Sequence, residues 1–165
     1  MFDAETTARA EEIVLAFRTR GLMLATAESC TGGLVAGALT AIAGASDVVE
    51  RGFVTYSNRA KTELLGVPEV VLANHGAVSA ETARAMAEGA ASRAPVEVAV
   101  SVTGVAGPGG GSAEKPVGLV HFACAFRGRA TVHRRLSFGD LGRDEIRRRA
   151  VLAALDLLAE AAARA

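Results

Sequence analysis

Three side chains that could act as nucleophiles stand together early in the chain, at Ser29, Cys30 and Thr31. They lie between an apolar run and Gly32 and Gly33, so TAESCTGG predicts a turn from a strand into a helix. The N–H groups of a first helical turn lack internal partners and could hold a phosphate or the oxyanion of acyl transfer. The alternative is that Ser29 or Thr31 only caps the helix. Cys30 would need a cationic neighbour to react, and the sequence shows none nearby, which favours a packing role.

A lysine follows a second predicted strand, in the stretch YSNRAK, which also contains the only tyrosine, Tyr56. With Ser57 or Asn58 as the N-cap, Lys61 falls in the first turn of a helix, and its stem shares an apolar face with two leucines. Burial there would lower its pKa and let it deprotonate a serine, as in Ser–Lys variants of the catalytic triad. A free lysine titrates near ~10.4, so neutrality at pH 7 requires roughly 4 to 5 kcal/mol of differential desolvation. A lysine whose ammonium group stays at the surface is the alternative.

A glycine-rich stretch, TGVAGPGGGSAEKP, follows a third predicted strand. It lacks the Gly-Lys-Ser/Thr ending of a phosphate-binding P-loop, and a flexible surface loop is an equally good interpretation. Thr103 and Gly104 are better placed than the loop tip, because they end a strand that is predicted to be central. Ligands of α/β sheets collect at the carboxyl ends of strands. If the three strands are parallel, all three stretches meet at one edge of the sheet.

The elements that must position these residues follow from caps and hydrophobic periodicity. Helices are predicted from about Ala4 to Arg20 after an Asp3 cap, over 32–44, 58–66 and 80–94, and from about Asp144 onward. Strands are predicted over 22–27, 52–57 and 97–103, with an antiparallel hairpin over 117–126 and 130–138. We expect a single domain, residues 1–165, with the fold of a three-layer α/β/α sandwich. Its sheet is expected to be mixed and mostly parallel, ending in the C-terminal antiparallel hairpin.

Composition narrows the class of protein further. The 18 basic and 18 acidic residues balance, whereas nucleic-acid binding normally needs a basic excess. The N-terminus is acidic and amphipathic, and no apolar run reaches the roughly 18 residues of a membrane span. Cys30 and Cys124 form neither a CxxC motif nor part of a metal quartet, and the three histidines are scattered. A cytoplasmic protein that binds no membrane, nucleic acid or metal is expected.

Five stretches together resemble the C-terminal domain of the CinA family, over nearly the whole chain. They are AESCTGGLVAGALT, RGFVTYSNRAKTELLGV, HGAVSAETARAMAEGA, VSVTGVAGPGGGSAEKPVGLVHFA and DEIRRRAVLAALDLL, in this order. Family members with this domain hydrolyse the amide of nicotinamide mononucleotide to nicotinic acid mononucleotide and ammonia. The resemblance implies a Ser–Lys dyad of Ser29 and Lys61, with Tyr56 as a substrate contact or proton-network partner, and no cofactor. The predicted substrate-binding residues are Cys30, Thr31, Gly32, Gly33, Asn58, Thr103, Gly104, Gly107, Gly109 and Arg147.

Two features depart from the family pattern. Longer members carry an N-terminal nucleotide-pyrophosphatase domain, so a stand-alone deamidase of pyridine nucleotide salvage is expected here. SFGDLGRDEIRRR differs from the usual compact Gly-Asp-Arg arrangement, which leaves a phosphate contact at either Arg143 or Arg147. The alanine-rich last helix and the family resemblance favour a homodimer. The alternatives are a non-catalytic nucleotide-binding module and an amidohydrolase acting on a related pyridine carboxamide.

Overall fold

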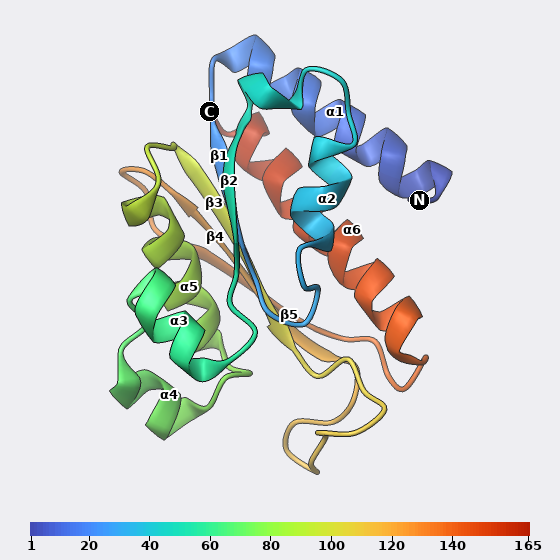
Figure 1. Cartoon of the computed structure of the whole chain (residues 1–165), viewed down its shortest axis with the longest axis vertical. Coiled ribbons are helices and arrows are strands. Elements are labelled where there is room, and N and C mark those ends of the chain that lie inside the picture. Colours follow the sequence, from blue (N-terminus) through green and yellow to red (C-terminus); the bar gives the residue numbers. More distant parts are fainter.

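The computed structural model describes all of residues 1–165, and its sheet lies between two layers of helices (Figure 1). The elements are α1 (Ala4–Arg20), β1 (Leu24–Glu28), α2 (Leu34–Thr40), a short 3-10 helix (Ala45–Asp47), β2 (Val49–Val54), α3 (Asn58–Leu65), α4 (Glu69–His75), α5 (Ala80–Arg93), β3 (Val98–Gly104), β4 (Leu119–Phe126), β5 (Val132–Ser137) and α6 (Arg143–Ala163). None of these helices combines the length and apolarity needed to cross a bilayer.

Side-chain capping sets the start of three of the six α-helices, as the sequence predicts. Asp3, Ser57 and Ser79 each accept a hydrogen bond from the backbone N–H three residues on, which starts α1, α3 and α5. Gly66 ends α3 in the left-handed region, with φ of 67°, where glycine carries no Cβ penalty. The predicted bounds of these three helices are confirmed to within a residue.

Helix α2 and strand β2 differ most from their predictions. Strand β2, Val49–Val54, lies three residues before the predicted 52–57, and α2 is shorter than predicted. It ends at Thr40 rather than at Gly44, because Gly44 takes a left-handed φ of 83° and begins the 3-10 helix. Only one face of α2 is fully buried, at Val35, Ala38 and Leu39, so the helix is not enclosed on every side. Its other apolar positions, Leu34, Ala36 and Gly37, remain partly open to solvent.

The sheet has the strand order β2-β1-β3-β4-β5. Strand β1 pairs in parallel with both β2 and β3, whereas β4 pairs antiparallel with β3 and with β5. This arrangement confirms the mixed sheet and the C-terminal hairpin. Because β1, β2 and β3 are parallel, their carboxyl ends share one edge of the sheet, the lower edge in Figure 1.

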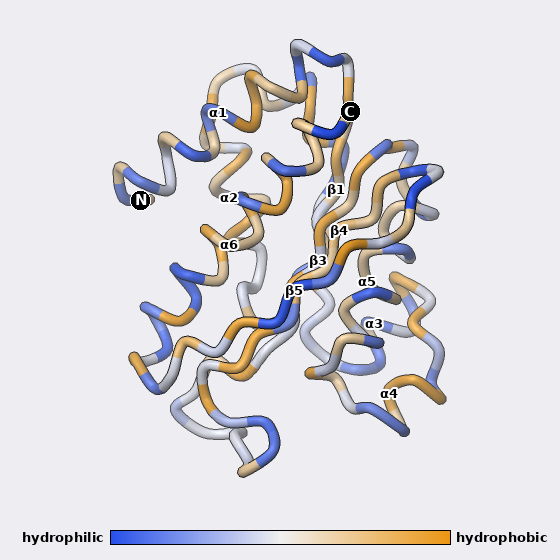
Figure 2. Tube along the Cα trace, turned by 180° about the vertical axis from the view of Figure 1, so that it is seen from behind, coloured by the Kyte–Doolittle hydropathy of each residue, from blue (hydrophilic) through white to orange (hydrophobic).

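The two faces of the sheet carry unequal cores. Helices α1, α2 and α6 cover one face with a cluster of 28 buried apolar residues. Helices α3, α4 and α5 cover the other, where two smaller clusters of 9 and 4 residues are built largely from alanine. Apolar segments run along the strands between these layers (Figure 2). Small side chains let the second layer lie close: a Cβ on Gly89 of α5 would sit 2.0 Å from the Leu65 carbonyl oxygen.

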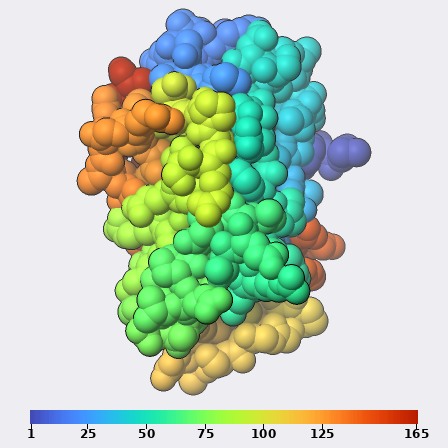
Figure 3. All heavy atoms as spheres, turned by 60° about the vertical axis from the view of Figure 1, so that its left-hand side comes forward, coloured from blue at the N-terminus to red at the C-terminus, as the bar shows by residue number.

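The segment between β3 and β4, residues 105–118, extends beyond the carboxyl edge of the parallel strands (Figure 1). In the space-filling view it protrudes beneath α3 and α4 at the same end of the molecule (Figure 3). This segment is the glycine-rich stretch of the sequence. The fold therefore brings the chain around Ser29, the start of α3 and the glycine-rich segment to one edge.

Candidate active site

The end of β1 places two successive polar side chains on opposite faces of the sheet. Side chains of a strand alternate between its faces, so Glu28 points toward α2 while Ser29 points toward α3. The backbone N–H of Ser29 donates to the carbonyl of Val102 at 2.9 Å, which continues the pairing of β1 with β3. The backbone of Ser29 is thereby held at the sheet edge, and the residue is 9% exposed.

Lys61 meets this serine from the first turn of α3. Its Nζ lies 3.0 Å from Ser29 Oγ and donates to the Thr55 carbonyl oxygen at 2.8 Å. The residue is 1% exposed, so its amine is almost entirely removed from solvent. The structure thus shows the buried arrangement of this lysine and not the surface alternative.

The environment of Lys61 favours its neutral form. Burial lowers the pKa of its amine, and both hydrogen-bond partners of Nζ are uncharged oxygens. A Cys30 thiolate would oppose this effect. Burial, however, raises the pKa of the Cys30 thiol to about 12, so that thiol is protonated near neutral pH. Cys30 therefore neither compensates a charged lysine nor supplies a ready nucleophile.

A pocket of about 270 Å³ opens above the Ser29–Lys61 pair. It is bounded by the end of β1, the start of α3, the segment between α4 and α5, and the glycine-rich segment. Eight residues of the predicted site line it: Ser29, Cys30, Tyr56, Lys61, Thr103, Gly104, Gly107 and Gly109. Gly104 is required by close packing, since a Cβ there would lie 2.7 Å from a Val120 methyl group. The three predicted stretches thus converge on one cavity.

Five predicted site residues lie outside this pocket lining: Thr31, Gly32, Gly33, Asn58 and Arg147. The N–H groups of the two glycines are already used, because Gly32 donates to the Ser29 carbonyl and Gly33 to the Glu28 carboxylate, both at 3.0 Å. Thr31 is fully buried, and neither it nor Ser29 caps α2.

Asn58 and Arg147 also contact parts of the molecule other than the pocket. Asn58 lines a separate surface hollow beside Arg59 and Thr62. Arg147 donates to the carbonyl oxygens of Cys30 and Thr31 at 3.2 and 3.1 Å, from the far side of the turn.

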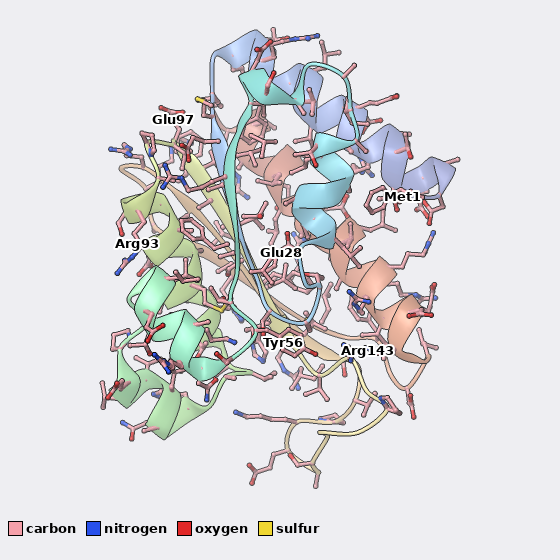
Figure 4. The ribbon with its side chains drawn as sticks, viewed as in Figure 1. Met1, Glu28, Tyr56, Arg93, Glu97 and Arg143 are labelled. Carbon is pink, nitrogen blue, oxygen red and sulfur yellow. The ribbon has the colours of Figure 1, made fainter.

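Of the two arginines weighed for a phosphate contact, Arg143 is the one that lines the pocket. Its guanidinium donates to the Gly107 carbonyl at 2.9 Å and to the Tyr56 hydroxyl oxygen at 3.1 Å. Tyr56 and Arg143 lie near each other at the lower end of the molecule (Figure 4). This bridge ties the end of β2 and the glycine-rich segment to the start of α6, so it spans the mouth of the pocket.

Sequence reasoning missed the part of the pocket wall that is formed by the segment between α4 and α5. Ala77 and Val78 line the pocket, as do Val105 and Ala106 on the opposite side. The hydroxyl of Thr103 donates to the Ala77 carbonyl at 2.7 Å, which holds this wall against β3. Small apolar side chains carry no chemical signature, so only their place in the fold identifies them. No group of three or more His, Cys, Asp or Glu side chains is arranged to hold a metal ion.

The fold and the pocket define a class: an α/β/α protein with a serine hydroxyl beside a buried lysine at the carboxyl edge of its parallel strands. Such a pair can perform acyl transfer, with the amine removing and returning the proton of the hydroxyl. The model of the CinA C-terminal domain matches residues 6–162. The chain belongs to this family.

Relatives of two lengths support this assignment. Nicotinamide-nucleotide amidohydrolase PncC of Escherichia coli K12 is 50% identical over 159 residues, which are 96% of this chain and 95% of PncC. A putative competence-damage inducible protein of Caldicellulosiruptor bescii is 58% identical over 116 residues, but the match spans only 28% of that longer protein. Among solved structures, the competence/damage inducible protein CihA of Agrobacterium tumefaciens superposes with a TM-score of 0.95, at 54% identity over 97% of each chain.

Proposed function

We propose that the protein hydrolyses the carboxamide of nicotinamide mononucleotide to nicotinic acid mononucleotide and ammonia. The observation that carries the proposal is the 3.0 Å contact between Ser29 Oγ and Lys61 Nζ, which is buried and has no carboxylate partner. The half-identity to PncC over nearly the full length of both chains supports the choice of substrate. We place this reaction in pyridine nucleotide salvage in the cytoplasm, with residues 1–165 as one catalytic domain acting in a homodimer.

The first half of the reaction forms an ester on the serine. Neutral Lys61 takes the proton of Ser29 while Oγ attacks the carboxamide carbon. No protein oxygen accepts a hydrogen bond from the N–H groups of Cys30 or Thr31. We assign the oxyanion to the N–H of Cys30, which directly follows the nucleophile and lines the pocket, whereas Thr31 is fully buried outside it. Lys61 then passes its proton to the amide nitrogen, the C–N bond breaks and ammonia leaves.

The second half reverses these proton movements, with water in place of ammonia. Lys61 removes a proton from a water molecule that attacks the ester carbonyl, and the tetrahedral intermediate collapses with cleavage of the bond to Ser29 Oγ. The serine regains its proton from Lys61, and the carboxylic acid product leaves as its carboxylate. The same two side chains therefore serve both halves, and no further base is required.

Arg143 is our candidate for the 5′-phosphate of the substrate. Two of its five N–H donors are used, on Gly107 and Tyr56, so others are available to an anion at the pocket mouth. The N–H groups of the glycine-rich segment lie on the same side and could add to this contact. Tyr56 accepts a hydrogen bond from Arg143 and also lines the pocket, and we assign it a contact with the pyridine ring or ribose.

The test is release of ammonia from nicotinamide mononucleotide. We expect the wild-type chain to be active and Ser29→Ala and Lys61→Arg to lose activity by at least about 10⁴-fold, as for other nucleophile–base units. Lys61→Arg keeps the positive charge and removes the base. Lys115→Arg is the matched control, since Lys115 is the only other lysine and lies outside the pocket. Full activity in Lys61→Arg would refute the dyad.

Two other outcomes identify the alternatives. Calorimetric binding of the nucleotide without product would indicate a non-catalytic binding module. Faster turnover of a different pyridine carboxamide would keep the mechanism and replace the substrate.

A further inference from the structure

A buried carboxylate next to the nucleophile is not used by the chemistry above. Glu28 ends β1 and is 1% exposed. Its two oxygens accept hydrogen bonds from the backbone N–H groups of Gly33, Val35 and Ala36, at 3.0, 3.0 and 2.8 Å. The Thr26 hydroxyl donates a fourth, at 3.2 Å. Four donors around one enclosed carboxylate are the surroundings of a charged group that is fully satisfied.

The N–H donors are those that the start of α2 leaves without intrahelical partners. The N-cap residue of α2, Gly33, has no side chain to cap the helix. Glu28, five residues earlier in the preceding strand, accepts these hydrogen bonds instead. The positive end of the helix is thus occupied by an anion of the protein itself. It is closed to a substrate phosphate, which leaves Arg143 and the glycine-rich segment for that role.

The turn that carries the nucleophile is also held by hydrogen bonds from its other side. Arg147 of α6 donates to the carbonyls of Cys30 and Thr31, while Glu28 takes N–H groups from the residues that follow. Arg147 thus binds carbonyl oxygens of the turn, and Glu28 binds backbone N–H groups. Figure 4 shows Glu28 at the base of α2, where the turn leaves the sheet.

We propose that Glu28 and Arg147 are positioning residues, which act on the reaction only through the placement of Ser29. The residues between these anchors include two glycines with positive φ, Gly32 at 61° and Gly33 at 97°, so the turn has little stiffness of its own. If either anchor is lost, Ser29 Oγ shifts away from Lys61 Nζ. The inference rests on the proposed function for the identity of the nucleophile.

The experiment compares isosteric or size-matched variants with controls taken from the same chain. Glu28→Gln keeps the shape but turns an NH₂ group toward backbone donors. Glu97→Gln is its control, because the Glu97 carboxylate also accepts a backbone N–H, from Met23 at 2.8 Å, at the opposite end of the sheet. Arg147→Met is matched by Arg148→Met on the same helix. The Arg148 change removes surface ion pairs to Asp3 and Glu5 at the start of α1.

We expect Glu28→Gln and Arg147→Met to lower kcat by on the order of 10²-fold with KM within about twofold, the effect of misplacing a reacting atom by about 1 Å. Both controls should stay within about twofold of wild type in both constants. Crystal structures of the two variants should show the Ser29 Oγ to Lys61 Nζ distance beyond the range of a hydrogen bond.

A folded Glu28→Gln or Arg147→Met protein with an unchanged Ser29–Lys61 distance and wild-type kcat would overturn the inference. A loss confined to KM would also overturn it, since that would indicate substrate contact. If Glu28→Gln does not fold, Arg147→Met decides, because Arg147 is only partly buried. An inactive wild-type chain would defeat the proposed function alone, while the distance measured in the variants still tests the positioning.

Discussion

Replacing Lys61 with methionine isolates the energetic consequence of burying an amine beside Ser29. Methionine is unbranched, of similar length, and cannot bind a proton. Lys61 is 1% exposed, and no carboxylate stands near Nζ to offset its charge. Its pKa in the folded protein is therefore lowered, whereas in the unfolded chain it returns to about 10.4.

The sign of the effect follows from proton counting. Between the folded-state pKa and the unfolded-state pKa, the unfolded chain binds one more proton than the folded protein, so stability rises with pH. Below that window both states are protonated, and above it both are neutral. Within it, the unfolding free energy of wild type should gain up to about 1.4 kcal/mol per pH unit relative to Lys61→Met.

Urea denaturation in steps from about pH 6 to about pH 10 measures this difference directly, because all other groups are shared by the two proteins. Lys115→Met is the control for the loss of one amine at the surface. A wild-type minus Lys61→Met difference that stays flat across the series would refute the lowered pKa, and with it the neutral base. Equal divergence of both variants from wild type would show that burial is not the cause.

Two further predictions test the packing and the specificity of the site. Gly89→Ala should destabilise the protein by about 1 to 3 kcal/mol in urea unfolding, since its Cβ would lie 2.0 Å from the Leu65 carbonyl; a stabilised variant would contradict this contact. Arg143→Met should raise KM for nicotinamide mononucleotide by roughly 10- to 10²-fold and leave the dephosphorylated riboside unaffected, as expected for one charged hydrogen bond to phosphate. Equal losses on both substrates would remove Arg143 from phosphate recognition.

Much of the architecture could be predicted because it depends on local chemistry. Asp3, Ser57 and Ser79 mark helix starts by hydrogen bonds that reach only three residues along the chain. The convergence of Ser29 and Lys61 followed from a general property of parallel strands, whose carboxyl ends share an edge. Neither inference needs knowledge of distant contacts.

The missed features depend on geometry that spacing does not encode. The cap of α2 comes from Glu28, and its one sequence signal is a carboxylate at the end of a buried strand. Arg143 and Arg147 stand four residues apart on α6, so their spacing puts both on one helix face. In the fold, Arg143 contacts the pocket segment at Gly107, whereas Arg147 contacts the turn that follows Ser29. The shortened α2 depends on the backbone angle of Gly44.

The alternation of Glu28 and Ser29 at the end of β1 constrains how this chain can vary in length. Successive side chains of a strand point to opposite faces of the sheet. Inserting one amino acid within β1 would therefore turn the Ser29 hydroxyl into the α2 layer and the Glu28 carboxylate toward Lys61. Insertions in pairs would preserve the facing. The number of residues in a single short strand thus determines which layer receives the Ser29 hydroxyl.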